Sequence, residues 1–131
     1  MRHALRFHVL MLPNVGWGEL KARVVRLEEL GLDVAGLADH FVDWTNPVVP
    51  WFETWTSLAA VAEATSTIRL TTVVMQILLR NLAMLARQVL TLDHISNGRI
   101  ELGLGTGLTI DPSYTMAGRP IRVHRTVRRP C

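Results

Sequence analysis

Residues 92–105 read LDHISNGRIELGLG, and this stretch decides the fold prediction because it joins the end of a helix to the start of a strand. Asn97-Gly98 is a turn signal that ends the apolar helical pattern before it. Residues 100–104 then begin a strand, and the glycines from Gly103 onward end it. The stretch therefore predicts a complete helix-to-strand junction.

The same pattern recurs toward the N-terminus. We expect further strands at residues 5–11, 34–38 and 68–74. Apolar residues at helical spacing predict the intervening helices: Leu20, Val24, Leu27 and Leu30, then Trp55, Leu58, Ala59 and Ala62, then Leu82, Leu85, Ala86 and Val89. Gly31 is a suitable stop for the first helix, and Asn81 is a suitable N-cap for the third.

Three strand-helix units followed by a fourth strand predict the α/β class with parallel strands, because crossovers of this length join strands that run the same way. We expect the N-terminal half of a TIM (β/α)8 barrel, about three and a half units, since a closed barrel takes roughly 250 residues and this chain has 131. An open doubly wound sheet has the same periodicity, and the pattern alone does not separate the two.

The charge of the chain is concentrated at one end. The formal net charge is +3, but five of the 14 basic residues fall in residues 119–131 and all 11 acidic residues precede them, so residues 1–118 carry 9 minus 11, or −2. We therefore divide the chain into a partial barrel domain, 1–118, and an Arg/Pro-rich tail, 119–131. The tail is interpreted as disordered or translated out of frame, with a nucleic-acid-binding arm as the alternative.

Other compositional features limit the compartment and the chemistry. No apolar run approaches the roughly 18 residues of a membrane helix, so we expect no membrane partner and a cytoplasmic location. Cys131 is the only cysteine, which excludes an internal disulfide and cysteine-based metal sites. We expect no metal site, because no histidines and carboxylates have zinc-like spacing.

Candidate reactive residues stand at the ends of the predicted strands, where the loops of an α/β barrel converge. Asp39 and His40 follow the second strand, and such a pair can relay a proton, although a loop cap and a packed histidine would look the same. Trp44 lies on no apolar stripe and is a candidate to contact a planar ligand. By contrast, Trp55 fits a core position, and His94 fits a structural role in the last turn of its helix.

The segment Gly103-Leu104-Gly105-Thr106-Gly107 would let a backbone approach a ligand, and a tight structural turn is the alternative. It is not a dinucleotide fingerprint, because Leu108 stands where that motif needs glycine.

Two stretches resemble the bacterial luciferase-like family of flavin and deazaflavin oxidoreductases. Residues 92–105 resemble its "LDxxSxGRxxLGLGxG" signature, and Ala38-Asp39-His40-Phe41 resembles the strand-two motif of its deazaflavin-using branch. The resemblance implies that Asp39, His40 and the loop Gly105-Thr106-Gly107 lie near the cofactor ring, with Trp44 beside the substrate. It also implies a non-proline cis peptide, Val73-Val74, behind that ring.

By this resemblance, the catalytic candidates are His40 and Trp44, and the cofactor is a deazaflavin of the F420 type, with FMN as the alternative. The implied chemistry is monooxygenation or hydride transfer involving a small organic substrate. Leu108 departs from the Glu of the deazaflavin sugar-phosphate dehydrogenases, which argues against that substrate class.

From its length we expect a truncated fragment that is inactive alone. A non-enzymatic half barrel that forms a homodimer through its open edges is the alternative, and nucleic acid is not expected as a partner.

Overall fold

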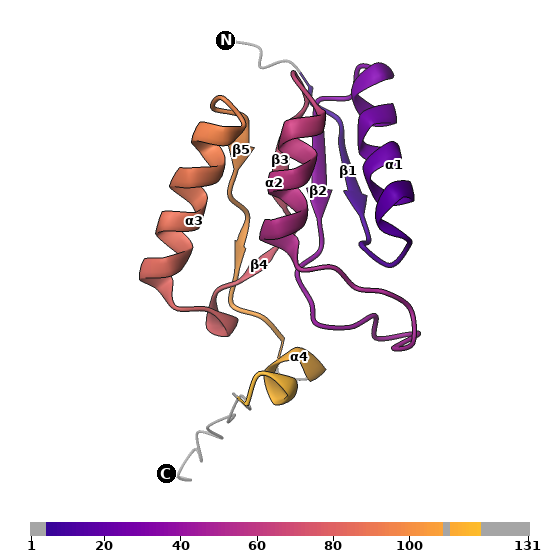
Figure 1. Cartoon of the computed structure of the whole chain (residues 1–131). Helices are drawn as coiled ribbons and strands as arrows, with labels where there is room; N and C mark the ends of the chain where they lie inside the picture. Colours follow the sequence, from indigo (N-terminus) through magenta and orange to yellow (C-terminus); the bar gives the residue numbers. More distant parts are fainter. Residues whose placement is uncertain (1–4, 109–110, 119–131) are drawn as a thin grey trace, which may run out of the picture.

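The computed structural model describes residues 5–108 and 111–118, and its centre is a parallel sheet with the strand order β1-β2-β3-β5 (Figure 1). The strands of this sheet are β1 (His8–Met11), β2 (Val34–Leu37), β3 (Arg69–Thr72) and β5 (Ile100–Glu101). A second parallel pair continues two of them: β4 (Met75–Gln76) and β6 (Leu104–Gly105).

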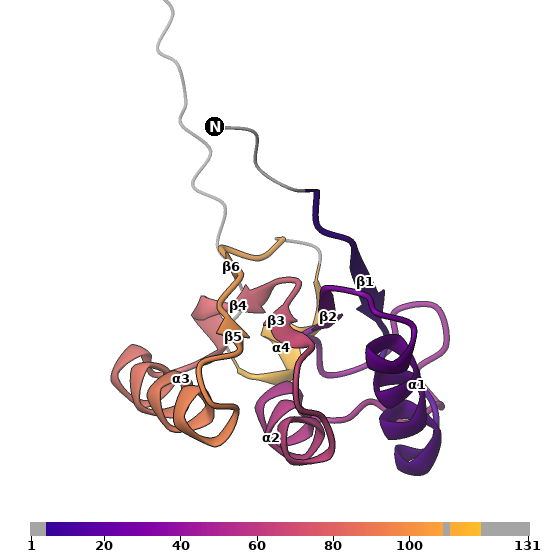
Figure 2. The ribbon, with the colours of Figure 1, turned by 90° about the horizontal axis from the view of Figure 1, so that it is seen from above.

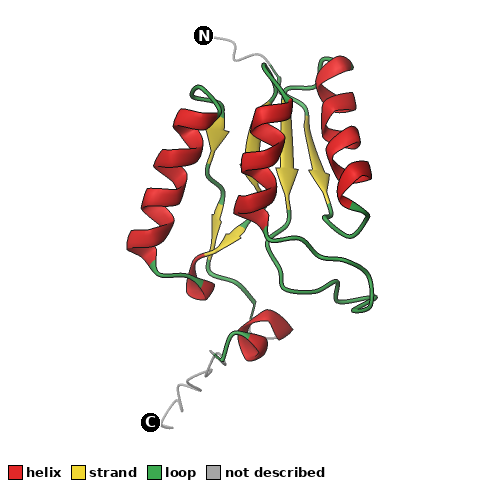
Figure 3. Cartoon of the chain, in the orientation of Figure 1, coloured by secondary structure: helices red, strands yellow, loops and turns green. Residues whose placement is uncertain are grey.

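Three long helices follow the strands in turn: α1 (Trp17–Glu29), α2 (Thr54–Ala64) and α3 (Leu82–Ile95). All three lie on one face of the sheet and leave the other face bare (Figure 2). A short 3-10 helix, η1 (Ile77–Leu79), precedes α3, and α4 (Pro112–Met116) lies beyond the carboxyl ends of the strands (Figure 3). No helix in the described part of the chain is long and apolar enough to cross a membrane.

This arrangement confirms the predicted half barrel. The strands occur in sequence order and the helices cover one face, whereas a doubly wound sheet changes direction and carries helices on both faces. The Asn81 side chain caps α3 as predicted, because its Oδ1 accepts hydrogen bonds from the N–H groups of Ala83 and Met84. Gly31 has a φ of +74° just after α1, the left-handed conformation that ends a helix.

The strands differ from the prediction in length and continuity. The third predicted strand is broken after Thr72, and a cis peptide bond joins Val73 to Val74 before β4 begins. The fourth divides in the same way into β5 and β6, and the two broken strands stay paired with each other, β3 with β5 and β4 with β6. The first strand begins only at His8, and the helix α4 was not predicted. The tail 119–131 lies outside the described residues.

The hydrophobic core lies between the helices and the sheet. Alternate strand residues face the helices, among them Met11, Leu37 and Leu70, and all three are buried. The predicted helical stripes meet them from the other side, where Leu20 and Leu58 have almost no exposed surface. Burial of this apolar surface holds the helices onto the sheet.

Arg99 is a buried charged residue that links several elements of this half barrel. It is 9% exposed and its guanidinium makes five hydrogen bonds. The acceptors are the backbone oxygens of Ala62, Thr65, Ile68 and Ser96 and the Oγ1 of Thr65, at 2.7 to 3.0 Å. They belong to the end of α2, the start of β3 and the end of α3. A single side chain therefore joins three elements, and its contacts at the start of β3 and in α2 span 31 and 37 residues of sequence.

Glu28 makes a comparable junction near the end of α1. Its Oε1 accepts hydrogen bonds from the backbone N–H groups of Ser66, Thr67 and Ile68 and from the Thr67 hydroxyl. Burial acts to raise the pKa of Glu28, but these hydrogen bonds to the ionised form outweigh it and lower that pKa to about 2. The carboxylate therefore ties α1 to the turn that leads into β3.

The bare face of the sheet carries a small ionic network. Both guanidinium nitrogens of Arg6 contact Glu101, at 2.5 and 2.8 Å, and Arg69 contacts the same carboxylate. Glu101 belongs to β5 and Arg6 precedes β1, so the contact spans the whole width of the sheet. The Arg6 hydrogen bond is the main cause of a lowered pKa of Glu101.

We expect Arg99→Lys to lower the free energy of unfolding by about 3 kcal/mol or more, because an ammonium cannot replace the guanidinium fork and leaves buried carbonyls unpaired. Urea unfolding followed by circular dichroism measures the loss. Arg87→Lys, on the exposed side of α3, should change it by less than about 0.5 kcal/mol. Equal losses in the two variants would contradict the role given to Arg99.

We expect Glu28→Gln to cost about 1 to 3 kcal/mol at neutral pH, where the native carboxylate is ionised. A carboxyl group whose native pKa is lowered stabilises the fold above its ordinary pKa near 4.5, and this stabilisation is lost as the pH falls toward 2. The difference between the two proteins in urea unfolding should therefore shrink between about pH 5 and pH 2. A difference independent of pH would contradict this prediction.

Candidate functional site

The candidate site is a cavity at the carboxyl ends of the strands, where an α/β barrel holds its reactive groups. It measures about 220 Å³ and gathers residues from the loops after β2, β3 and β6. Its walls are formed by His40, Trp44, Val73, Val74, Gln76, Gly107, Leu108 and Asp111. Five of the eight residues predicted for the site lie here: His40, Trp44, Val73, Val74 and Gly107.

Asp39 and His40 are adjacent in sequence but have different surroundings. The Asp39 carboxylate is buried, and Arg80 binds both of its oxygens, at 2.5 and 2.7 Å. The backbone N–H of Gln76 donates a further hydrogen bond to it, at 3.0 Å. Asp39 therefore joins the loop after β2 to β4 and η1, and it does not line the cavity.

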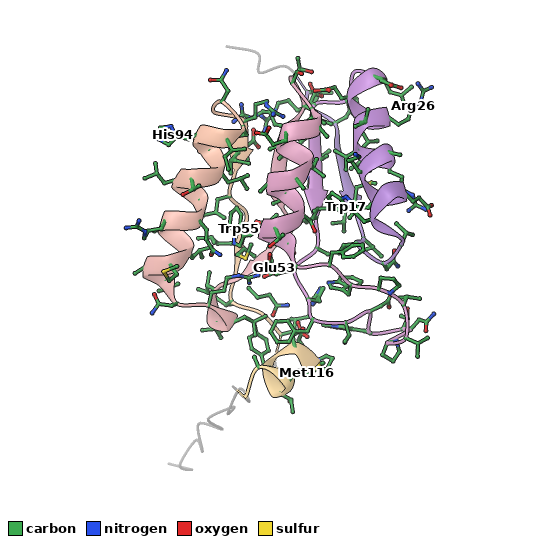
Figure 4. All side chains as sticks on the ribbon, viewed as in Figure 1. Trp17, Arg26, Glu53, Trp55, His94 and Met116 are labelled. Carbon is green, nitrogen blue, oxygen red and sulfur yellow. The ribbon has the colours of Figure 1, made fainter. Side chains whose placement is uncertain are left out.

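Arg80 continues this network to the start of α2. It also contacts the Glu53 carboxylate, which caps α2 by accepting from the N–H of Thr56. Glu53 and Trp55 lie at the lower end of α2 in Figure 4, near the carboxyl ends of the strands. Burial acts to lower the pKa of Arg80, but its bonds to Asp39 and Glu53 outweigh that effect and raise it.

The His40 imidazole is held by one hydrogen-bonding nitrogen and two aromatic neighbours. Its Nδ1 lies 3.0 Å from Oδ2 of Asp111. The ring meets Trp44 and Trp51 edge to face, with centroids 5.0 and 5.8 Å away. Trp44 is 42% exposed and lines the cavity.

Asp111 organises the polar end of the cavity. Its Oδ1 caps α4 by accepting from the N–H of Ser113 at 2.8 Å, and its Oδ2 accepts from Nε2 of Gln76 at 2.6 Å. Burial acts to raise the pKa of Asp111, but the hydrogen bonds from Ser113, Gln76 and His40 outweigh it, so the pKa is lowered. The carboxylate is therefore ionised at neutral pH.

Gln76 links the two aspartates. Its Nε2 also donates to the backbone oxygen of Asp39, at 2.7 Å. Its Oε1 is buried and has no hydrogen-bond partner among the described residues. A buried acceptor without a donor is costly, so a ligand N–H or O–H would be favoured there.

The Val73-Val74 bond is cis, as predicted, and both side chains line the cavity. Gly105 packs against this bond so closely that a Cβ on it would lie 2.3 Å from Cγ2 of Val74. At Gly107 a Cβ would meet the Tyr114 hydroxyl. Thr106 is exposed, and its carbonyl accepts from that hydroxyl at 3.4 Å. Close packing within the chain therefore requires glycine at 105 and 107.

The remaining aromatic and histidine predictions concern residues outside the cavity. Trp55 is buried in the core, as predicted. His94 lies in the last turn of α3, at the end of that helix far from α4 (Figure 4). His8, for which no role was predicted, lies on the bare face of the sheet, directly over Gly36. In the described residues, no group of three or more His, Cys, Asp or Glu side chains could hold a metal ion.

Three further residues of the site were not predicted: Gln76, Arg80 and Asp111. Asp111-Pro112 is a helix-start signal that could have revealed α4 and its cap. Gln76 is the first polar residue after an apolar run, which is where a strand-end side chain is expected. Arg80 carries no local signal, because its partner Asp39 is 41 residues away.

Comparison with known proteins identifies the family. The family model described as luciferase-like monooxygenase matches residues 5–128, and so extends beyond the boundary placed at residue 118. An F420-dependent glucose-6-phosphate dehydrogenase of Amycolatopsis mediterranei is 38% identical over 104 residues. That match covers 77% of this chain and 30% of the relative, so the chain spans about a third of the length of such relatives.

Solved structures share the fold. The F420-dependent tetrahydromethanopterin reductase of Methanopyrus kandleri matches 88% of this chain and 30% of its own, with a TM-score of 0.71 and 25% identity. The oxygenating constituent of 3,6-diketocamphane monooxygenase of Pseudomonas putida, in complex with FMN, matches 88% of this chain and 33% of its own, with a TM-score of 0.74 and 21% identity. By its sequence and its half-barrel fold, this chain belongs to the luciferase-like monooxygenase family of oxidoreductases.

Proposed function

We propose that this chain supplies the wall of a luciferase-like oxidoreductase site that holds the ring of a deazaflavin cofactor of the F420 type. The observation that carries the proposal is the cavity in which the side chains of Val73 and Val74, the unpartnered Oε1 of Gln76 and the His40 ring meet. When bound, such a cofactor supplies two-electron transfer to or from an organic substrate. The protein supplies position and electrostatics.

The residues present fit the edge of such a ring. Val73 and Val74 give it an apolar wall, and the Oε1 of Gln76 can accept a hydrogen bond from a ring N–H. The cavity of about 220 Å³ is smaller than the 300 Å³ or more that usually encloses a whole ligand. It therefore suits part of a cofactor, in keeping with the 30% of the Amycolatopsis relative that the chain spans.

The predicted site residues divide into three roles under this proposal. Val73, Val74 and the loop Gly105-Thr106-Gly107 form the backing of the ring. Asp39 fixes that backing from behind through its bonds to Arg80 and Gln76. His40 and Trp44 face the small organic substrate, because both line the cavity and both keep exposed surface.

F420 is favoured over FMN by the comparisons. The relatives at 38% to 40% identity are named F420-dependent, whereas the FMN-bound structure is 21% identical. We propose a small organic substrate and not a sugar phosphate, because Leu108 lines the cavity with an apolar side chain.

We expect the chain to quench the fluorescence of coenzyme F420 on titration and to bind FMN more weakly. Val74→Ala should weaken F420 binding about fivefold or more, because it removes two methyl groups from the apolar wall behind the ring and each buried group of this size is worth about 0.8 kcal/mol. Phe41→Ala is the matched control, since Phe41 is exposed nearby but does not line the cavity. Tighter binding of FMN would overturn the cofactor preference, and no binding of either would overturn the proposed site.

We also propose that two copies of the chain associate as a homodimer. Among the described strands, β1 and β5 are the two edges of a four-stranded parallel sheet. A two-fold axis along the strands would pair β1 of each copy with β5 of the other and give eight strands, the number in a closed barrel. Paired edges also remove the aggregation risk of exposed strands.

Sedimentation at micromolar concentration should show a dimer that Leu10→Lys weakens, because Leu10 lies on the edge strand β1 and is already 48% exposed. Leu30→Lys, 58% exposed at the end of α1, is the control and should leave the dimer intact. A monomer for the unaltered chain, or equal effects of the two changes, would contradict the edge-to-edge arrangement.

A further inference from the structure

The hydrogen bonds around His40 determine which of its nitrogens carries the proton. Nδ1 has two neighbours, Oδ2 of Asp111 at 3.0 Å and Nε2 of Gln76 at 2.9 Å. In residues 5–108 and 111–118, no group is hydrogen-bonded to Nε2 of His40. The imidazole is therefore held from the Nδ1 side, and His40 lines the cavity with its side chain 30% exposed.

Gln76 does not donate a hydrogen bond to Nδ1 of His40. An amide nitrogen carries two hydrogens, and the shortest contacts of the Gln76 Nε2 are the Asp39 carbonyl at 2.7 Å and Oδ2 of Asp111 at 2.6 Å. Both of these groups are acceptors, so they use both hydrogens. The contact between the Gln76 Nε2 and Nδ1 of His40 is then a proximity of two donors that share one acceptor.

Asp111 is a fixed acceptor. Its side chain is 2% exposed, and its two oxygens receive donors from Ser113, Gln76 and His40. A protonated carboxyl would lose one of these contacts, and their net effect lowers the pKa of Asp111. Facing an ionised carboxylate, Nδ1 of His40 is stable only as N–H.

We infer that Asp111 is a positioning residue that fixes neutral His40 as its Nδ1–H tautomer and leaves the Nε2 lone pair as a hydrogen-bond acceptor on the cavity wall. The inference rests on the proposed function only for the identity of the ligand that Nε2 meets. Trp44 and Trp51 assist by packing edge to face against the ring, which restricts its rotation. The cavity then offers two unpaired acceptors, Nε2 of His40 and Oε1 of Gln76.

The test is to determine the His40 tautomer from the 15N chemical shifts of the imidazole in the full chain. At about pH 8.5 an ordinary histidine is neutral. We expect Nδ1 to resonate as a protonated nitrogen and Nε2 as an unprotonated one. Dominance of the Nε2–H tautomer in the unaltered chain would overturn the inference, whether or not the chain binds a deazaflavin.

Asp111→Asn is the decisive variant because asparagine caps helices as well as aspartate does but has only one oxygen to accept hydrogen bonds. We expect it to shift the His40 population toward the Nε2–H tautomer while circular dichroism stays unchanged. Glu63→Gln, on the exposed side of α2, removes the same charge far from the site and should leave the tautomer as it is. An unchanged tautomer in Asp111→Asn would overturn the role of Asp111.

Should Asp111→Asn fail to fold, Asp111→Ser keeps a capping hydroxyl and tests the same point. F420 titration of the unaltered chain is run in parallel, because it tests the proposed function alone. The expected tautomer without F420 binding would leave the inference standing and remove the proposed function. Binding of F420 together with the Nε2–H tautomer would support the proposed function and overturn the inference.

Discussion

The buried guanidinium of Arg99 is the interaction on which the rest of this half barrel depends. Four of its five hydrogen bonds go to backbone oxygens where α2 ends, where β3 begins and where α3 ends. Those three points fix the spacing of the third and fourth barrel strands, and both strands lead directly into the candidate site. Apolar burial supplies most of the folding free energy, but it does not specify direction. The planar guanidinium group does specify direction, because each of its N–H groups donates a hydrogen bond only to an acceptor that lies along a fixed direction.

At the opposite end of the sheet, hydrogen bonds of buried side chains likewise fix the elements of the candidate site. Asp39 and His40 are consecutive residues with different surroundings. Arg80 binds the Asp39 carboxylate, whereas His40 lines the cavity. Arg80, Asp39, Gln76 and Asp111 form a continuous polar layer, because Arg80 contacts Asp39, Asp39 contacts Gln76 and Gln76 contacts Asp111. Each of these contacts joins residues at least 35 positions apart. Such a layer keeps the histidine oriented before any ligand arrives. Orientation of this kind is what a redox protein contributes, because the electron chemistry belongs to the cofactor.

Much of the fold could be predicted from local patterns, and the polar layer could not. The helix stripes, the Asn81 cap and the Asn97-Gly98 turn depend on neighbouring residues, so the sequence shows them directly. Beyond the break after Thr72 the chain pairs with β6 and no longer with β2, which no local pattern records. The cis bond was expected only from a family resemblance. The contact of His40 with Asp111 joins residues 71 positions apart, and only the folded chain brings them together.

The ionic contact between Arg6 and Glu101 has a mechanical consequence. It connects the segment before β1 to β5 across the bare face, and the two side chains meet only if the sheet curves toward that face. An arc that is already bent presents its edges at a defined angle, and a partner that completes the barrel does not have to bend it. Preorganisation of this kind lowers the entropic cost of association. Because the network is partly exposed, salt screens it, and the curvature of the half barrel therefore becomes a property of the ionic strength as well as of the sequence.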